Sequence, residues 1–346
     1  MKIKNINLIK VVGILLVIII HFGPMNYAHT NDKLDFNFFL LYRSFLAIGV
    51  ALLLIVNGYL VINKNYSLKK ILINIVHLAI LLFVFKFIYA LTFNELNFTI
   101  DSFLYSLMTT AAKNYRVNHL WFMYALIAIY FLLPLISKIF ENKKLYLYLT
   151  ILVCSYSFGF IIIETIFNLT NNYEMQLFQT LYPFQTHYLF ALSYFLLGGL
   201  IRQYEDKIKN LQINNIVLIL IMLSSLVIQA LYFVFINNLS QENFDPMYNG
   251  YSTLTTALNA TILFYLLKYR VRELNHKHLD GIAYYSLGIY LIHWPLAFYL
   301  KKQFLSNYFV LDYLSNIIIS LVILLICYLL CYLLGKNKYL QKLIKL

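Results

Sequence analysis

The sequence predicts an all-α protein, a polytopic membrane helix bundle of about ten transmembrane helices. Hydrophobic residues make up 62% of the 346 positions and charged residues 12%, so the chain could not surround a core with a water-soluble surface. Apolar runs also recur along the chain at about the 20 residues that a helix needs to cross a bilayer. Ten such runs leave short loops, and we therefore expect one membrane domain over residues 1–346.

The apolar runs give the expected helices in order. The first run follows Lys2, Lys4 and Lys10, as in a signal peptide, but no small-residue cleavage site follows it, so we expect a retained first helix. The expected spans are 6–24, 38–62, 68–93, 116–136, 146–168, 184–201, 213–237, 250–268, 282–301 and 308–335.

The positions of Lys and Arg indicate the orientation of these helices. With the N-terminus inside, cytoplasmic segments would hold 20 of the 27 cations and the opposite side 6, Arg43 among them, while Lys86 lies within a span. Cytoplasmic loops carry such an excess. We expect both termini in the cytoplasm and a multi-pass protein of the cell membrane, with the bacterial cytoplasmic membrane as its location.

The net charge of +13 has the same explanation. The cations lie at loop edges and form no basic face, so the lipid bilayer is an expected partner and nucleic acid is not. Three cysteines, Cys154, Cys327 and Cys331, lie inside apolar runs and are interpreted as packing residues rather than as a disulfide framework or a zinc site.

Histidines supply the candidate chemistry. Polar side chains at membrane depth are costly and tend to face the bundle interior. His21, His119, His187 and His293 lie toward the outer ends of four separate expected spans. His21 and His293 follow nearly unbroken apolar sequence, in GILLVIIIH and SLGIYLIHWPL, whereas His119 and His187 are also compatible with an interfacial role.

An imidazole suits general acid–base catalysis because its ordinary pKa, near 6.5, lets it take a proton from a hydroxyl and return it to a leaving group. Metal binding is the rival role. The histidines show no short-range ligand spacing, and neither Cys nor a carboxylate accompanies them in sequence, so we expect no metal.

Lys10 and His21 lie on the same expected helix. Their separation of 11 positions corresponds to about 16 Å of helical rise. One helix thus places a cation, suited to an anionic carrier, near the cytoplasmic boundary and a base near the other side. The alternative is that Lys10 snorkels and merely anchors the helix.

The sequence KVVGILLVIIIH, with Lys10 and His21 at its ends, resembles the first helix of the acyltransferase type 3 family of integral-membrane acyltransferases. That family normally has Arg at the first position. Lys keeps the charge but lacks the planar bidentate fork. The family commonly has an acidic residue three positions earlier, where this chain has Asn7.

Four further stretches resemble the family in the same order. They are LLLIVNGYL with Asn57, Gly58 and Tyr59; NHLWFMYALIAIYFLLPLI with His119, Trp121, Phe122, Tyr130 and Pro134; YFLLGGLI; and SLGIYLIHWPL with Tyr290 and His293. Together the five stretches run from residue 7 to residue 296. Lys69 and Lys70 stand near the place where the family often has arginines in its third helix.

The resemblance implies transfer of an acyl group, usually acetyl, from an acyl-CoA in the cytoplasm to a hydroxyl of a carbohydrate or similar acceptor across the membrane. It implies catalytic roles for His21, His119 and His293 and coenzyme-binding roles for Lys10, Lys69 and Lys70. Substrate-binding roles would fall to Asn57, Trp121, Tyr130 and Tyr290. Some family members carry an extracytoplasmic esterase-like domain, so we expect this chain to act alone or with a separately encoded partner.

Two other function classes stay open. A transporter or flippase of a lipid-linked saccharide would need a polar track across the bilayer with coupling carboxylates, and Glu164 is the one clear carboxylate at depth in the sequence. A membrane sensor or scaffold would leave the histidines at depth unexplained.

Overall fold

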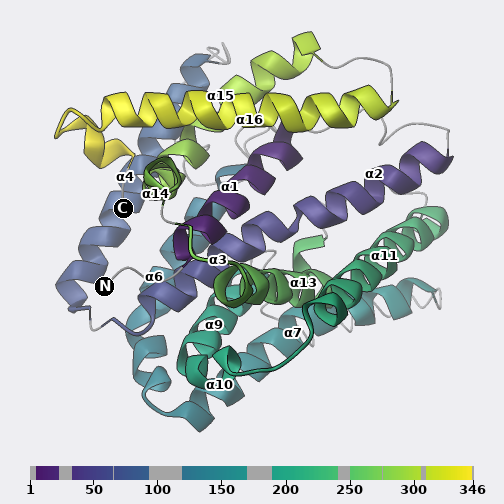
Figure 1. Cartoon of the computed structure of the whole chain (residues 1–346). Coiled ribbons are helices and arrows are strands. Elements are labelled where there is room, and N and C mark those ends of the chain that lie inside the picture. Colours follow the sequence, from purple (N-terminus) through teal and green to yellow (C-terminus); the bar gives the residue numbers. More distant parts are fainter. Residues whose placement is uncertain are drawn as a thin grey trace.

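The computed structural model describes residues 5–22, 33–64, 66–92, 119–169, 189–240, 250–274, 276–304 and 309–344. Helices account for the regular structure throughout these ranges, as predicted (Figure 1). The α-helices are α1 (Ile6–Phe22), α2 (Lys33–Leu46), α3 (Ile48–Val61), α4 (Leu68–Thr92), α6 (Trp121–Phe140), α7 (Lys143–Leu169), α9 (Leu189–Gln203), α10 (Glu205–Lys209), α11 (Asn215–Ser240), α13 (Leu254–Tyr265), α14 (Lys277–Tyr284), α15 (Ser286–Phe304) and α16 (Phe309–Leu334). Short 3₁₀ and π segments are η3 (Gly250–Ser252), η4 (Leu266–Arg270) and η5 (Leu340–Leu343).

Each of the ten expected spans overlaps a helix, although the second is divided at Ala47 into α2 and α3. Among the described residues, six helices are long and apolar enough to cross a membrane: Phe36–Val61, Leu68–Tyr89, Trp121–Phe140, Lys143–Ile163, Asn215–Asn238 and Tyr313–Leu334. Ile6–Phe22, Leu189–Gln203 and Ser286–Leu300 are shorter apolar helices. The all-helical fold is confirmed, while the number of ten spans and the cytoplasmic termini stay predictions.

Helix α1 lies in the interior of the bundle, where α3, α14, α15 and α16 contact it (Figure 1). Eleven of its residues are buried, among them apolar residues from Ile6 to Phe22. By contrast, α4, α7, α11 and α16 direct large apolar side chains outward, such as Leu72, Ile151 and Leu329, each more than half exposed. In a membrane, lipid tails would cover these outward faces, because the tails are as apolar as the side chains. The outer helices can therefore be apolar both toward the bundle and toward the lipid.

Helices α3 and α9 touch backbone to backbone. A methyl group on Gly58 would overlap the carbonyl oxygen of Phe195, and one on Gly198 would overlap the carbonyl oxygen of Ile55. Small residues at such crossings allow membrane helices to approach closely and gain dispersion contacts. The two glycines therefore fix the spacing between α3 and α9.

Polar side chains join α11 to α13 inside the bundle. The amide of Gln229 donates to the hydroxyl of Thr256 over 2.9 Å, and the hydroxyl of Thr255 donates to the amide oxygen of Gln229 over 3.1 Å. Each of these groups would lack a partner in hydrocarbon, which makes interhelical hydrogen bonds favourable there.

We expect Gly198→Ala to destabilise the protein by about 2 kcal/mol, because the new methyl group must push α9 away from α3. Gly159→Ala in α7 is the matched control, since nothing lies within 4 Å of the added carbon. That change should be neutral or stabilising by up to about 1 kcal/mol. Thermal unfolding in detergent measures both, and equal melting temperatures for the two variants would contradict the close crossing.

Candidate active site

Three of the four predicted histidines lie together in the structure. His21 is in the last turn of α1, His119 directly precedes α6, and His293 is in the middle of α15. Their ring centroids are 5.4 Å (His21 to His293), 5.8 Å (His119 to His293) and 6.0 Å (His21 to His119) apart. All three side chains are buried. His187 lies outside the described residues.

Two side chains from other helices hold the end of α1, where His21 lies. Ile20 lies in the last turn of α1, where carbonyls have no helical N–H partner, and Pro24, four residues after Ile20, has no N–H to offer. The Arg43 guanidinium donates to this carbonyl over 3.2 Å. Asn316 of α16 donates to the neighbouring carbonyl of Ile19 over 3.3 Å.

Arg43 is buried, although the cations were expected at loop edges. It lies within α2, is 1% exposed, and stacks over the ring of Phe39 at 5.2 Å. Its expected place on the outer side stays a prediction. A guanidinium with many donors can remain at depth where it meets helix carbonyls, especially at a helix C-terminus, whose dipole favours a cation.

The same arrangement recurs at α15. Pro295 removes the donor that would pair with the carbonyl of Leu291, and the hydroxyl of Tyr89 from α4 donates to this carbonyl instead. The Tyr89 oxygen also lies 3.0 Å from Nε2 of His119. Helices α4 and α15 and the start of α6 are thereby joined at one point.

Tyr290 and Trp294 complete the group around the histidines. The Tyr290 hydroxyl donates to the backbone carbonyl of His119, and its own carbonyl lies 2.6 Å from Nδ1 of His293. The indole of Trp294 stacks on His119 at 5.1 Å and meets His21 edge-on at 5.0 Å. We call His21, Tyr89, His119, Tyr290, His293 and Trp294 the histidine cluster.

Three ring nitrogens of the histidine cluster are buried and have no hydrogen-bond partner among the described residues. They are Nδ1 of His119, Nε2 of His293 and Nε1 of Trp294. A buried polar atom without a partner is rare and points to a ligand or to water. The cluster therefore offers hydrogen-bonding positions for a bound molecule.

The other predicted substrate residues are divided between places. Tyr290 belongs to the histidine cluster. Trp121 packs against the rings of Phe190 and Tyr251, at 5.3 and 5.7 Å. Asn57 of α3 and Tyr130 of α6 are electrostatic neighbours of one another, and the amide oxygen of Asn57 is buried with no partner in the described part of the chain.

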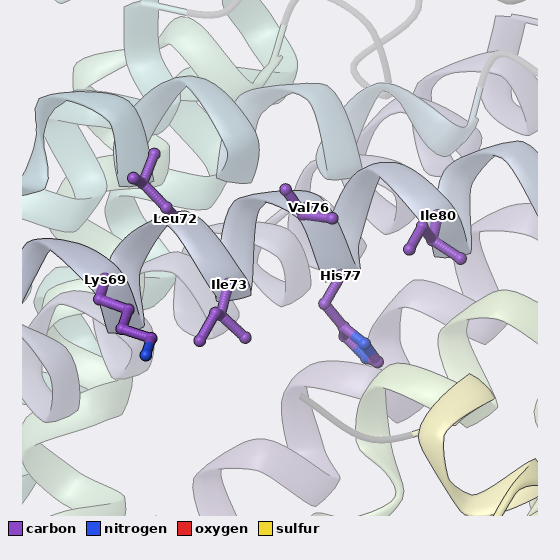
Figure 2. Close-up of a pocket in the computed structure, with 6 residues that line it drawn as sticks. All are labelled: Lys69, Leu72, Ile73, Val76, His77 and Ile80. Atoms are coloured by element: carbon purple, nitrogen blue, oxygen red, sulfur yellow. The ribbon is translucent and has the colours of Figure 1, made fainter.

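The predicted coenzyme-binding lysines lie at the far end of the molecule from the imidazoles. Lys10 is near the start of α1, with Lys64 as an electrostatic neighbour. Lys69 and Lys70 are exposed in the first turn of α4. Figure 2 shows Lys69 on the same side of α4 as Ile73 and His77, where it lines an open, largely apolar groove together with Leu72, Val76 and Ile80.

A polar network closes the end of the bundle near α10. The Tyr59 hydroxyl donates to Glu205 over 2.6 Å, Lys268 pairs with the same carboxylate at 3.1 Å, and Arg202 donates to the Tyr59 oxygen over 2.9 Å. Partial burial acts to raise the pKa of Glu205, but the hydrogen bond from Tyr59 and the pairing with Lys268 outweigh it, so its pKa is lowered. Glu205 therefore stays ionised and compensates the buried ammonium of Lys268.

Among the described residues, no three or more His, Cys, Asp or Glu side chains are grouped so that they could hold a metal ion. Nε2 of His119 already faces Tyr89, and Nδ1 of His293 faces a carbonyl.

Comparison with known protein families identifies the family of this chain. A family model described as an acyltransferase domain matches residues 3–336, nearly the whole chain. The chain belongs to the acyltransferase type 3 family. No curated protein and no solved structure matches it. As a member of this family with several apolar helices of spanning length, the acyltransferase is a multi-pass membrane protein.

Sequence reasoning missed four residues around the imidazoles: Arg43, Tyr89, Trp294 and Asn316. The prolines give a signal for two of them, Arg43 and Tyr89. Because Pro24 and Pro295 have no N–H, the carbonyl four residues before each needs a donor from another part of the chain. Which residue supplies the donor depends on helix packing and is not encoded locally.

We expect Arg43→Met to destabilise the acyltransferase by about 2 kcal/mol, because the buried carbonyl of Ile20 then loses its donor. Thermal unfolding in detergent measures this loss. Lys138→Met removes a cation whose side chain is 77% exposed and should leave stability unchanged. An Arg43→Met variant as stable as the wild type would show that the contact does not hold α1.

We expect Glu205→Gln to destabilise the protein by about 2 kcal/mol at neutral pH, because it leaves Lys268 buried without a counter-charge. A lowered pKa stabilises the fold above the ordinary value of 4.5 and loses this effect as pH falls through the folded-state pKa. The wild type should therefore lose stability below pH 4.5, and the variant should lack this component. Glu141→Gln, at an exposed pair with Lys138, is the control and should have no effect.

Proposed function

We propose that this acyltransferase moves an acetyl group from acetyl-CoA in the cytoplasm to a hydroxyl of a cell-envelope carbohydrate on the other side of the membrane. The observation that carries the proposal is the histidine cluster, in which imidazoles from three separate segments meet, and in which Nδ1 of His119 and Nε2 of His293 have no partner among the described residues. Family membership supplies the acyl transfer, and the cluster supplies bases for a hydroxyl acceptor.

The donor would bind at the lysine end of α1. Coenzyme A carries phosphates, and Lys10, Lys69 and Lys70, with Lys64 beside Lys10, offer cations at the ends of α1, α3 and α4. From Lys10 to His21 the helix rises about 16 Å. The pantetheine arm would extend along this length and carry the thioester toward the imidazoles.

The Asn57 and Tyr130 pair supports this path. The unpartnered amide oxygen of Asn57 is a buried acceptor, and the pantetheine arm carries amide N–H donors. A bound arm would satisfy this oxygen. We therefore assign Asn57 and Tyr130 to the donor side, and Trp121 and Tyr290, near His119, to the acceptor side.

The chemistry follows from the groups present. An imidazole takes the proton of the acceptor hydroxyl as its oxygen attacks the acyl carbon. The indole N–H of Trp294 is a buried donor available to the oxygen that becomes negative in the tetrahedral intermediate. His21, at the end of the helix that begins with Lys10, acts either as a general base or as a transient acyl acceptor.

His21→Ala should lower acetyl transfer by at least about 100-fold, because it removes a base or nucleophile from the cluster. The assay uses purified protein in liposomes with labelled acetyl-CoA and measures free coenzyme A and acetylated acceptor. His278→Ala, a change at an exposed histidine outside the cluster, is the matched control and should keep full activity. Wild-type transfer by His21→Ala would remove His21 from the mechanism.

The same assay separates the rival function. A transporter or flippase of a lipid-linked saccharide would release no coenzyme A, because no bond changes. Mass spectrometry of surface glycans from cells with and without the gene then identifies the acceptor by its missing acetyl groups.

A further inference from the structure

The hydrogen bonds around His119 define which of its nitrogens carries the hydrogen. A neutral imidazole has one N–H donor and one nitrogen with a free lone pair, and the partner of one nitrogen determines the role of the other. For His119 the partner is known: Nε2 lies 3.0 Å from the hydroxyl oxygen of Tyr89. The question is which of these two groups donates.

Tyr89 has one hydrogen, and it is already engaged. The carbonyl of Leu291 can only accept, so the Tyr89 hydroxyl donates to it. This carbonyl is available because Pro295, four residues later in α15, cannot provide the usual helical N–H. Tyr89 therefore offers only its oxygen lone pairs to His119.

His119 must then donate from Nε2, which leaves Nδ1 as the nitrogen with the lone pair. Nδ1 is buried and has no partner among the described residues. The side chain is 4% exposed. The ring is also fixed in orientation, because it stacks on Tyr89 at 5.2 Å and on Trp294 at 5.1 Å.

We infer that Pro295 and Tyr89 together fix His119 as the Nε2–H tautomer, so that Nδ1 is the base that receives the proton of the acceptor hydroxyl. Tyr89 is then a positioning residue, acting through His119. The inference rests on the proposed function for the base role, whereas the tautomer follows from the hydrogen bonds alone.

The acceptor oxygen forms a bond to the acyl carbon while its hydrogen passes to Nδ1 of His119. With His119 as this base, His21 has the role of transient acyl acceptor, so the bond from the acyl carbon to a ring nitrogen of His21 breaks and its electron pair returns to that nitrogen. The proton on Nδ1 then passes to that atom, which restores the neutral His119.

His293 shows the complementary arrangement on the same cluster. Its Nδ1 lies 2.6 Å from the carbonyl of Tyr290, which can only accept, so Nδ1 carries the hydrogen and Nε2 the lone pair. Nε2 too is buried without a partner in the described residues. His293 is oriented by its own helix, whereas His119 depends on a tyrosine from another helix, which makes the Tyr89 contact the one that a substitution can test cleanly.

Nitrogen NMR of the ring-labelled protein in lipid bilayers tests the tautomer without any activity. His119 is assigned by the signals lost in His119→Gln. We expect a protonated Nε2 and an unprotonated Nδ1 in the wild type, and a mixture of tautomers in Tyr89→Phe. A His119 with its hydrogen on Nδ1 in the wild type would overturn the inference.

Kinetics test the base role. Loss of the group that orients a functional histidine typically lowers activity by about 10- to 100-fold, and we expect this fall in kcat for Tyr89→Phe with little change in KM. His119→Gln keeps an amide donor toward Tyr89 but has no base, and should lose about 100-fold or more. Tyr146→Phe, which removes a buried hydroxyl that donates to the carbonyl of Leu196 over 2.9 Å, is the matched control and should keep its kcat.

The outcomes separate the two proposals. Unchanged kcat in both Tyr89→Phe and His119→Gln, in a wild type that transfers acetyl groups, would overturn the base role of His119. A wild type that transfers no acetyl group while NMR shows the Nε2–H tautomer would overturn the proposed function and leave the tautomer assignment standing.

Discussion

The structure depends on one constraint, that a backbone carbonyl buried in hydrocarbon must find a hydrogen-bond donor. Pro24 comes after α1 and Pro295 lies within α15. Neither proline has an N–H that could bond to the carbonyl four residues before it. In both cases a long side chain from another helix supplies it: Arg43 for the carbonyl of Ile20 and Tyr89 for that of Leu291. Both carbonyls lie within two residues of a histidine of the cluster, so the same bonds that satisfy the backbone also fix the imidazoles.

The close helix contacts and the histidine cluster lie toward different ends of the bundle. At one end Gly58 and Gly198 bring α3 and α9 into backbone contact, and Glu205 joins these helices to Lys268 of η4. Near the other end of α1, some polar atoms of the histidine cluster have no partner in the part of the chain that the structure describes. Unsatisfied atoms persist when the surrounding packing determines their position, and these are the atoms to which the proposed mechanism assigns the acyl transfer.

Sequence patterns were informative for those features that can be recognised from a single residue or within a single helix. Each apolar run that was expected to span the membrane overlaps a helix of the structure. The runs can be recognised because the thickness of the hydrocarbon sets a minimum length for each helix. His21 and His293 could be recognised as candidate site residues because each follows nearly unbroken apolar sequence, where a polar side chain without a partner would be costly. The sequence shows the charge of Arg43 but not the carbonyl that it meets, so the burial of this side chain could not be predicted. Asn57 and Tyr130 were grouped with Tyr290, although the described contacts place them apart.

The sequence by itself determined that this chain is a helical membrane protein of the acyltransferase type 3 family and which histidines carry its candidate chemistry. Composition, span length and motif order are properties of the linear chain, and they need no partner to be recognised. Only the tertiary structure decided that His21, His119 and His293 meet, and that Tyr89 reaches both Leu291 and His119. Those contacts join residues up to about 270 positions apart, and their geometry is set by helix packing, which no local pattern encodes.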